Sequence, residues 1–158
     1  LWQGFLELEE CQEAQRALAQ IILDKALNEA EHFLPWLPEI DLRTAAFFFD
    51  LRVQQGGMTK RRGDGSLWSP EILDRPEDAN YAQALDFASS RGKTKTAGAW
   101  ASACTQDPLA QVLLHYAFAR AAMARTEYVW DALSRRGTIA CRVGSVHGAW
   151  MDLTQILP

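Results

Sequence analysis

The sequence is poor in cysteine, and its cysteines and histidines do not have the spacing of metal ligands. Its three cysteines, Cys11, Cys104 and Cys141, are far apart, with no Cys-x-x-Cys pair and no cysteine–histidine pair at ligand spacing. The sequence therefore predicts no metal site. At most one disulfide can form, and the third cysteine then remains a free thiol. The cysteines therefore do not indicate whether the protein acts in an oxidising or a reducing compartment.

Long apolar runs and an excess of positive charge are also missing. The apolar stretches are well short of the roughly 20 residues that span a bilayer, so we expect no membrane span. Sixteen basic and 20 acidic side chains give a net charge of -4, which argues against a nucleic-acid partner. The start, Leu1-Trp2-Gln3, has neither an initiator methionine nor a signal-peptide pattern. We therefore expect a fragment or a processed product.

The short signatures of serine hydrolases, P-loop proteins, zinc peptidases and dinucleotide-binding enzymes are absent. What the sequence does contain is 48% hydrophobic residues, among them six Trp and seven Phe, in 158 residues. This composition is typical of one packed domain and not of a disordered chain.

Hydrophobic periodicity predicts a mainly α fold, because apolar residues recur at helical spacing between breaks rich in turn-forming residues. The predicted helices are 5–33, 41–55 (Asp41 as N-cap, Gly56-Gly57 as stop), 77–90, one opened by Asp107-Pro108, and 126–136 ending at Gly137, with breaks or loops at 34–38, 58–76 and 91–96. Alternation on either side of 144–148 then predicts a short β-hairpin near the C-terminus.

One carboxylate lies inside an apolar run, Phe47-Phe48-Phe49-Asp50-Leu51. Burial of an unpaired charge costs several kcal/mol, so Asp50 requires a compensating partner if it faces inward. The stripe predicted to face inward on this helix consists of Ala46, Phe49, Asp50 and Val53.

Arginine is the residue that best compensates such a carboxylate, because a guanidinium can donate two parallel hydrogen bonds to it. Arg120 lies on the predicted inward stripe of the helix opened at Asp107 and is the expected partner of Asp50, with Arg135 as a second. Two interpretations remain open. The group is either a structural ion pair that orients helices or a charge relay beneath an active-site cleft.

Four further residues are candidates for contact with a ligand. Gln54, Gln55 and Gly56 stand at the end of the predicted Asp50 helix, where they are either polar ligand contacts or ordinary helix-terminal residues. His147 lies in the predicted turn of the hairpin and is either a ligand contact or a hydrogen-bonded structural residue.

Two separated stretches resemble a known family. Residues 45–57, with Phe-Phe-Phe-Asp-Leu-Arg-Val-Gln-Gln-Gly-Gly, resemble the helix with an aromatic-aspartate-x-x-Val-x-x-Gly signature in lysozyme-like glycoside hydrolases of the chitosanase type. Residues 131–140 resemble their Ser-Arg-basic-x-Thr-Ile-Ala segment, and residues 144–153 resemble their Val-His-Gly turn. With the opening at 2–15, the resemblance covers most of the chain and is closest to bacterial peptidoglycan hydrolases.

This resemblance implies a lysozyme-like helical domain or its C-terminal lobe, with residues 1–158 forming a single hydrolase domain that lacks its N-terminal catalytic lobe. It implies a glycosidase that cleaves a β-1,4-linked amino-sugar polymer, above all peptidoglycan, without a cofactor. Such an enzyme acts in the bacterial periplasm or outside the cell after export, and an antibacterial secretion effector is one such role. An N-terminal lobe or a delivery module is the implied protein partner.

The resemblance also implies roles for individual residues. Asp50, with Arg135 by motif and Arg120 by its place on the apolar stripe, would form an ion network that supports a general-acid glutamate upstream of Leu1. The alternative is a module without enzymatic activity that binds glycan or protein, with Trp68 and Trp100 as contact surfaces.

Overall fold

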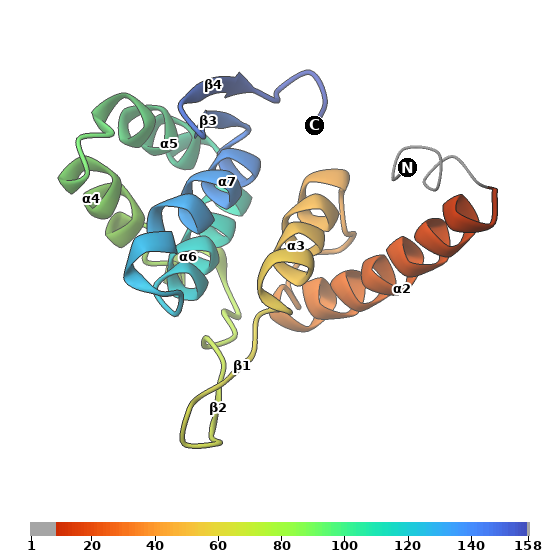
Figure 1. The fold of residues 1–158 in the computed structure, drawn as a ribbon. Helices are drawn as coiled ribbons and strands as arrows, with labels where there is room; N and C mark the ends of the chain where they lie inside the picture. The colour runs from red at the N-terminus through yellow and green to blue at the C-terminus, as the bar shows by residue number, and fades with distance from the viewer. Residues whose placement is uncertain (1–8, 158) are drawn as a thin grey trace.

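The computed structural model describes residues 9–157, and these form a mainly helical fold (Figure 1). The elements are α2 (Glu9–Phe33), α3 (Leu42–Gln55), β1 (Lys60–Arg61), β2 (Leu67–Trp68), η1 (Pro76–Asp78), α4 (Ala82–Ser90), α5 (Thr94–Gln106), α6 (Pro108–Ala121), η2 (Thr126–Tyr128), α7 (Val129–Cys141), β3 (Val143–Val146) and β4 (Ala149–Asp152). The predicted mainly α class with a C-terminal hairpin is confirmed. The predicted start of the first helix, at residue 5, lies outside the described residues.

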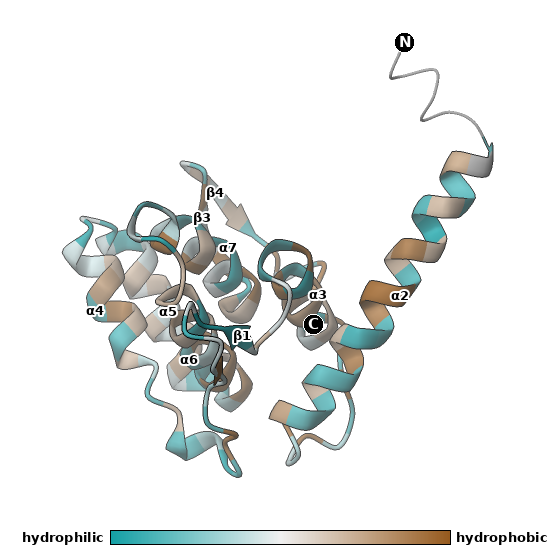
Figure 2. Cartoon of the chain, turned by 60° about the horizontal axis from the view of Figure 1, so that its bottom comes forward, coloured by the Kyte–Doolittle hydropathy of each residue, from teal (hydrophilic) through white to brown (hydrophobic). Residues whose placement is uncertain are grey.

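The helices form two groups that meet along α3 and α7. In one group α4, α5, α6 and α7 pack together under the β3–β4 hairpin, and in the other α2 packs against α3 (Figure 1). The first half of α2 extends away from the other helices, and residues 12–21 are exposed (Figure 2). No helix within residues 9–157 combines the length and the apolar character that a membrane crossing requires.

Helix α3 begins and ends where predicted but turns a different face to the core. The Asp41 side chain accepts from the Thr44 N–H, and Gly56 closes the helix in the left-handed conformation. The predicted inward stripe is wrong: Val53 is exposed, and the residues buried at helical spacing are Thr44, Phe47, Phe48 and Leu51. This orientation of α3 buries two phenylalanines and a leucine and leaves Asp50 at the edge of the interface. It has the lower free energy, because apolar burial is favourable and a charge at the edge loses less hydration.

Two loop predictions are wrong in part. The segment predicted as a loop over 91–96 runs into the first turn of α5, a helix of mostly small residues that buries Thr96, Ala97, Trp100 and Cys104 on one face. Within 58–76, β1 and β2 pair antiparallel, with Lys60 opposite Trp68. The helix predicted over 77–90 contains only α4, after the short turn η1.

Trp100 joins α5, α7 and the C-terminal hairpin. Its side chain is fully buried, and its indole N–H donates to the carbonyl of Val143 at 2.9 Å. The ring lies where a Cβ on Gly137 would be, so close packing requires a glycine at this position. The predicted end of the helix at Gly137 is wrong, because α7 continues to Cys141. Trp100 is thus a core residue and not the contact surface considered for a binding module.

The hairpin forms in the expected region, but its first strand begins later than predicted. Residues 138–141 belong to α7, and β3 pairs antiparallel with β4 from Val143 opposite Asp152 to Val146 opposite Ala149. His147 and Gly148 form the connection, with φ values of 49° and 83°. Two consecutive positive φ angles are typical of the tight turns that suit the twist of a hairpin.

Asp107 connects three helices. Its side chain caps α6 by accepting from the N–H groups of Leu109 and Ala110, as the Asp-Pro pair predicts. Arg43 of α3 donates to the same carboxylate at 2.5 Å and to the carbonyl of Ala140 in α7 at 3.3 Å. Burial raises the pKa of Asp107, but the hydrogen bond and charge of Arg43, with the two amide donors, outweigh burial and leave the pKa below its ordinary value.

We expect Gly137→Ala to lower the free energy of unfolding by roughly 1–2 kcal/mol, because overpacking against Trp100 exceeds the gain in helix propensity. Gly98→Ala is the matched control, since a Cβ there meets no atom within 4 Å, and we expect it to be neutral or stabilising by up to about 1 kcal/mol. Urea unfolding of both variants measures the difference. Equal effects would contradict the packing role of Gly137.

We expect Asp107→Asn to lower the free energy of unfolding by about 1–2 kcal/mol near pH 7, because asparagine caps a helix but does not neutralise Arg43. Folding lowers the pKa of this carboxyl, so its charge stabilises the protein above the ordinary pKa of 3.8, and this contribution is lost as the pH falls through the folded-state pKa. Urea unfolding from pH 7 to pH 3 should show the difference between variant and parent shrinking at low pH. A constant difference would exclude the charge as its cause.

Candidate functional site

Asp50 lies between two arginines of α7. Its Oδ1 accepts from Arg135 Nη2, and its Oδ2 lies 3.3 Å from Arg136 Nε. The exposed fractions of the Asp50, Arg135 and Arg136 side chains are 14%, 24% and 1%. The expected contact with Arg135 is present, and the carboxylate ties α3 to α7.

Arg136 is the member of this group that the sequence analysis missed. It donates from Nη1 to the side-chain oxygen of Gln55 at 2.8 Å. Burial lowers its pKa to about 10, against the opposing effect of the Asp50 charge, so the guanidinium stays protonated at neutral pH. The sequence holds a signal for it, because Leu133, Gly137 and Ala140 recur at helical spacing and Arg136 lies on the same helix face.

The expectation that Arg120 pairs with Asp50 is wrong. Arg120 donates from Nε to the carbonyl of Gly57 and from Nη2 to the carbonyl of Gln55, both at 2.8 Å. Gln55 is five residues beyond Asp50, more than one helical turn away. Arg120 therefore satisfies carbonyls at the end of α3, and burial lowers its pKa despite the nearby charge of Glu29.

Glu29 is a second buried carboxylate that the sequence analysis did not identify. It is 8% exposed, accepts from the Met58 N–H at 2.8 Å and lies 3.0 Å from Arg52 Nε. Gly57 has φ 117°, and a Cβ there would lie 2.7 Å from the Glu29 carboxylate. Glu29 therefore holds the chain in place just after α3, where Arg120 also binds.

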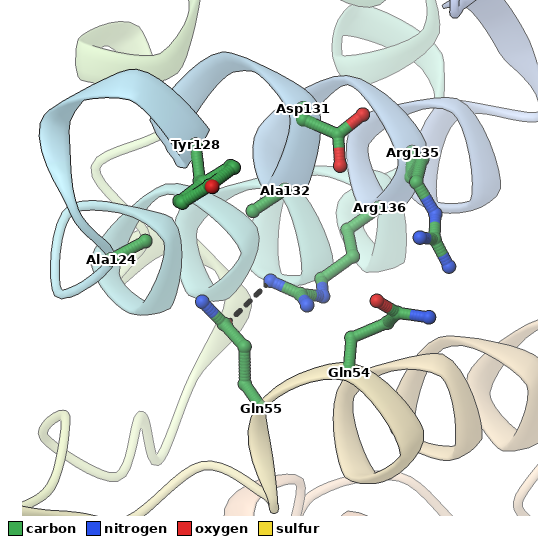
Figure 3. Close-up of a pocket in the computed structure, with 8 residues that line it drawn as sticks. All are labelled: Gln54, Gln55, Ala124, Tyr128, Asp131, Ala132, Arg135 and Arg136. Carbon is green, nitrogen blue, oxygen red and sulfur yellow. Dashed lines mark hydrogen bonds between the residues drawn. The ribbon is translucent and has the colours of Figure 1, made fainter.

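A polar pocket of about 230 Å³ opens between the end of α3 and the start of α7 (Figure 3). It contains both predicted glutamines and both arginines that contact Asp50, and Asp131 supplies a carboxylate. The lining residues are Gln54, Gln55, Ala124, Tyr128, Asp131, Ala132, Arg135 and Arg136. Amide, phenol, guanidinium and carboxylate groups suit a ligand rich in hydroxyl or amide groups.

The other two predicted ligand contacts lie outside this lining. Gly56 closes α3 in the left-handed conformation. His147 is exposed, with Nδ1 3.2 Å from Asp131 Oδ1. It therefore reaches the polar pocket only through Asp131.

A second, apolar pocket of about 430 Å³ lies on the other side of Asp50, between α2 and α3. Its lining is Leu23, Leu42, Ala45, Ala46, Phe49, Asp50, Val53 and Arg135. Arg135 lines both pockets. The ion pair of Asp50 and Arg135 therefore lies between the polar pocket and the apolar pocket. This combination is suited to a sugar ring, which has apolar faces and a hydroxylated edge.

Within residues 9–157, no group of three or more His, Cys, Asp and Glu side chains is placed to hold a metal ion. Comparison with known proteins found no matching family model and no significantly similar curated protein or solved structure.

We expect Asp50→Ala to lower the free energy of unfolding by about 3 kcal/mol, because it leaves the buried guanidinium of Arg136 without its carboxylate. The control is Asp78→Ala, which removes the exposed ion pair with Arg75 and should leave stability unchanged within experimental error. Thermal and urea unfolding measure both variants. Equal stability of Asp50→Ala and the parent would show that the network does not hold α3 to α7.

Proposed function

We propose that this chain is part of a glycoside hydrolase that cleaves a β-1,4-linked amino-sugar polymer, with peptidoglycan as the substrate. The observation that carries the proposal is the pairing of Asp50 with Arg135 and Arg136 beside the polar pocket. In the lysozyme-like hydrolases that the sequence resembles, an equivalent aspartate and its arginines support the catalytic acid.

The two guanidinium groups that line the polar pocket, those of Arg135 and Arg136, support a role beside a catalytic carboxyl. Arg135 and Arg136 share the carboxylate of Asp50, and Asp131 is a further carboxylate in the pocket lining, so two guanidinium groups and two carboxylates balance at this wall. A guanidinium near a carboxyl group favours its ionised form and so helps to set its pKa. Asp50 in this scheme is a positioning residue, because it holds the arginines and does not itself face the polar pocket.

The reaction requires two groups across the scissile bond. One carboxylic acid protonates the leaving oxygen, and a second group activates water or stabilises the oxocarbenium-like transition state. Asp131 is the only carboxylate that lines the polar pocket among the described residues. We propose that the proton donor is a glutamate that precedes Leu1 in a longer protein, and that the reaction takes place in the periplasm or outside the cell, where peptidoglycan lies.

The second candidate is a glycan-binding module without hydrolytic activity. The presence of a single carboxylate in the pocket lining favours it, because glycosidic cleavage ordinarily uses two. The two candidates share a ligand and differ in whether the glycan chain is cut.

Incubation of the protein, expressed with its natural flanking sequence, with purified peptidoglycan should release new reducing ends. We expect Arg135→Ala to lower this rate on the order of 100-fold, because it removes a group that positions the catalytic carboxyl beside the polar pocket. Arg62→Ala, in the exposed turn between β1 and β2, is the control and should keep the parent rate.

A pull-down with insoluble peptidoglycan separates the remaining outcomes. Binding that Arg135→Ala weakens, with no new reducing ends from any variant, would favour the binding module. Neither binding nor cleavage would contradict both candidates.

A further inference from the structure

Two of the three cysteines lie side by side in the core. Cys104 of α5 is fully buried, and Cys141, the last residue of α7, is 3% exposed, whereas Cys11 of α2 is partly exposed. The thiol groups of Cys104 and Cys141 are close enough for a hydrogen bond between them. The proposed hydrolase does not use this pair, so the following inference is independent of that function.

A packing contact one helical turn before the two cysteines brings α5 against α7. Trp100 lies four residues before Cys104, and Gly137 lies four residues before Cys141. Each therefore stands on the same helix face as its cysteine. The Trp100 ring occupies the position that a Cβ of Gly137 would take. The two helices thus approach closely just before the cysteine pair.

Ionic contacts join the same two helices on the other side of the pair. Asp107, which follows α5, accepts from Arg43 at 2.5 Å. Its Oδ2 also lies 3.9 Å from Nη2 of Arg142, the residue after Cys141. Arg43 donates in turn to the carbonyl of Ala140, the residue before Cys141, at 3.3 Å. The cysteines therefore lie between two independent sets of contacts, which hold α5 beside α7 without any bond between the sulfur atoms.

The surroundings of the pair do not suit the other common uses of cysteine. Within residues 9–157, neither thiol belongs to a group of three or more His, Cys, Asp and Glu side chains that could hold a metal ion. Burial raises the pKa of the Cys141 thiol well above its ordinary value, and the neighbouring Cys104 adds to this increase. A thiol in this state is neutral at physiological pH and a poor nucleophile. Cys141 is therefore not placed to act as a catalytic group.

We propose that Cys104 and Cys141 form a disulfide when the chain folds in an oxidising compartment, and that Cys11 remains a free thiol. The oxidant is a protein disulfide or a small-molecule disulfide. The thiolate of one cysteine attacks it, which gives a mixed disulfide and releases one thiol, and the second cysteine then displaces the other thiol. The two cysteines lose two protons and two electrons in all. The oxidant takes these up as its S–S bond becomes two thiols.

The position of this bond connects it to the polar pocket. The bond closes the loop that contains α6 and η2 and ties α5 to the end of α7 that leads into the hairpin. A cross-link of this kind stabilises a fold chiefly by restricting the unfolded chain. Arg135 and Arg136 lie one to two turns before Cys141 on the same helix. The disulfide therefore holds the helix that carries both arginines of the pocket.

The test is to unfold the chain and refold it either in a mixture of reduced glutathione and glutathione disulfide or in excess dithiothreitol. Free thiols are alkylated with iodoacetamide in denaturant, and trypsin digestion follows without reduction. The three cysteines lie in different tryptic peptides, 1–16, 96–120 and 137–142. In the glutathione sample we expect peptide 96–120 linked to peptide 137–142, alkylated Cys11, and a melting temperature about 10 °C above that of the dithiothreitol sample.

Two variants separate the effect of the bond from that of packing. Cys104→Ala should give no linked peptides and the same melting temperature in both samples, and Cys11→Ser should behave as the parent does. Three alkylated cysteines in the glutathione sample of the parent, or a linkage that includes Cys11, would overturn the proposal. Peptide mapping of the parent decides this even if Cys104→Ala does not fold. None of these measurements requires glycan cleavage, so their outcome is separate from that of the proposed function.

Discussion

The contact of Asp50 with Arg135 and Arg136 joins the two helix groups at the place where the polar and apolar pockets meet. Without the carboxylate, Arg136 would be a buried cation with only the Gln55 amide as a side-chain partner. The geometry of the polar pocket therefore depends on an electrostatic requirement. A guanidinium that is 1% exposed must keep a counter-charge close by.

The surrounding residues hold each end of this contact in place. On the α3 side, Arg120 binds the carbonyls of Gln55 and Gly57, and Glu29 binds the amide of Met58. On the α7 side, Trp100 packs on Gly137 and binds the hairpin through Val143. The ion pair is therefore built on packed elements, which is the arrangement that a preorganised binding site requires.

Much of the fold was predictable because its signals are local. Asp41 caps the start of α3 and Gly56 ends it, and Asp107 with Pro108 begins α6. These positions could be predicted because a helix cap depends only on residues a few positions apart. Helix α5 escaped prediction because its burial depends on one tryptophan among small residues. The end of α7 was misplaced because glycine at 137 serves close packing against Trp100 and not helix termination.

The sequence by itself determined the helical class, the positions of the strong caps, the terminal hairpin and the need of Asp50 for a cationic partner. Only the tertiary structure decided which arginine meets it, because partner choice depends on how α3 is rotated and how far α6 and α7 reach along it. The orientation of α3 about its own axis places Thr44, Phe47, Phe48 and Leu51 in the core and leaves Asp50 facing α7. Arg120, on an equally apolar stripe, meets backbone carbonyls instead, because side chains that are far apart in sequence are brought together only by packing.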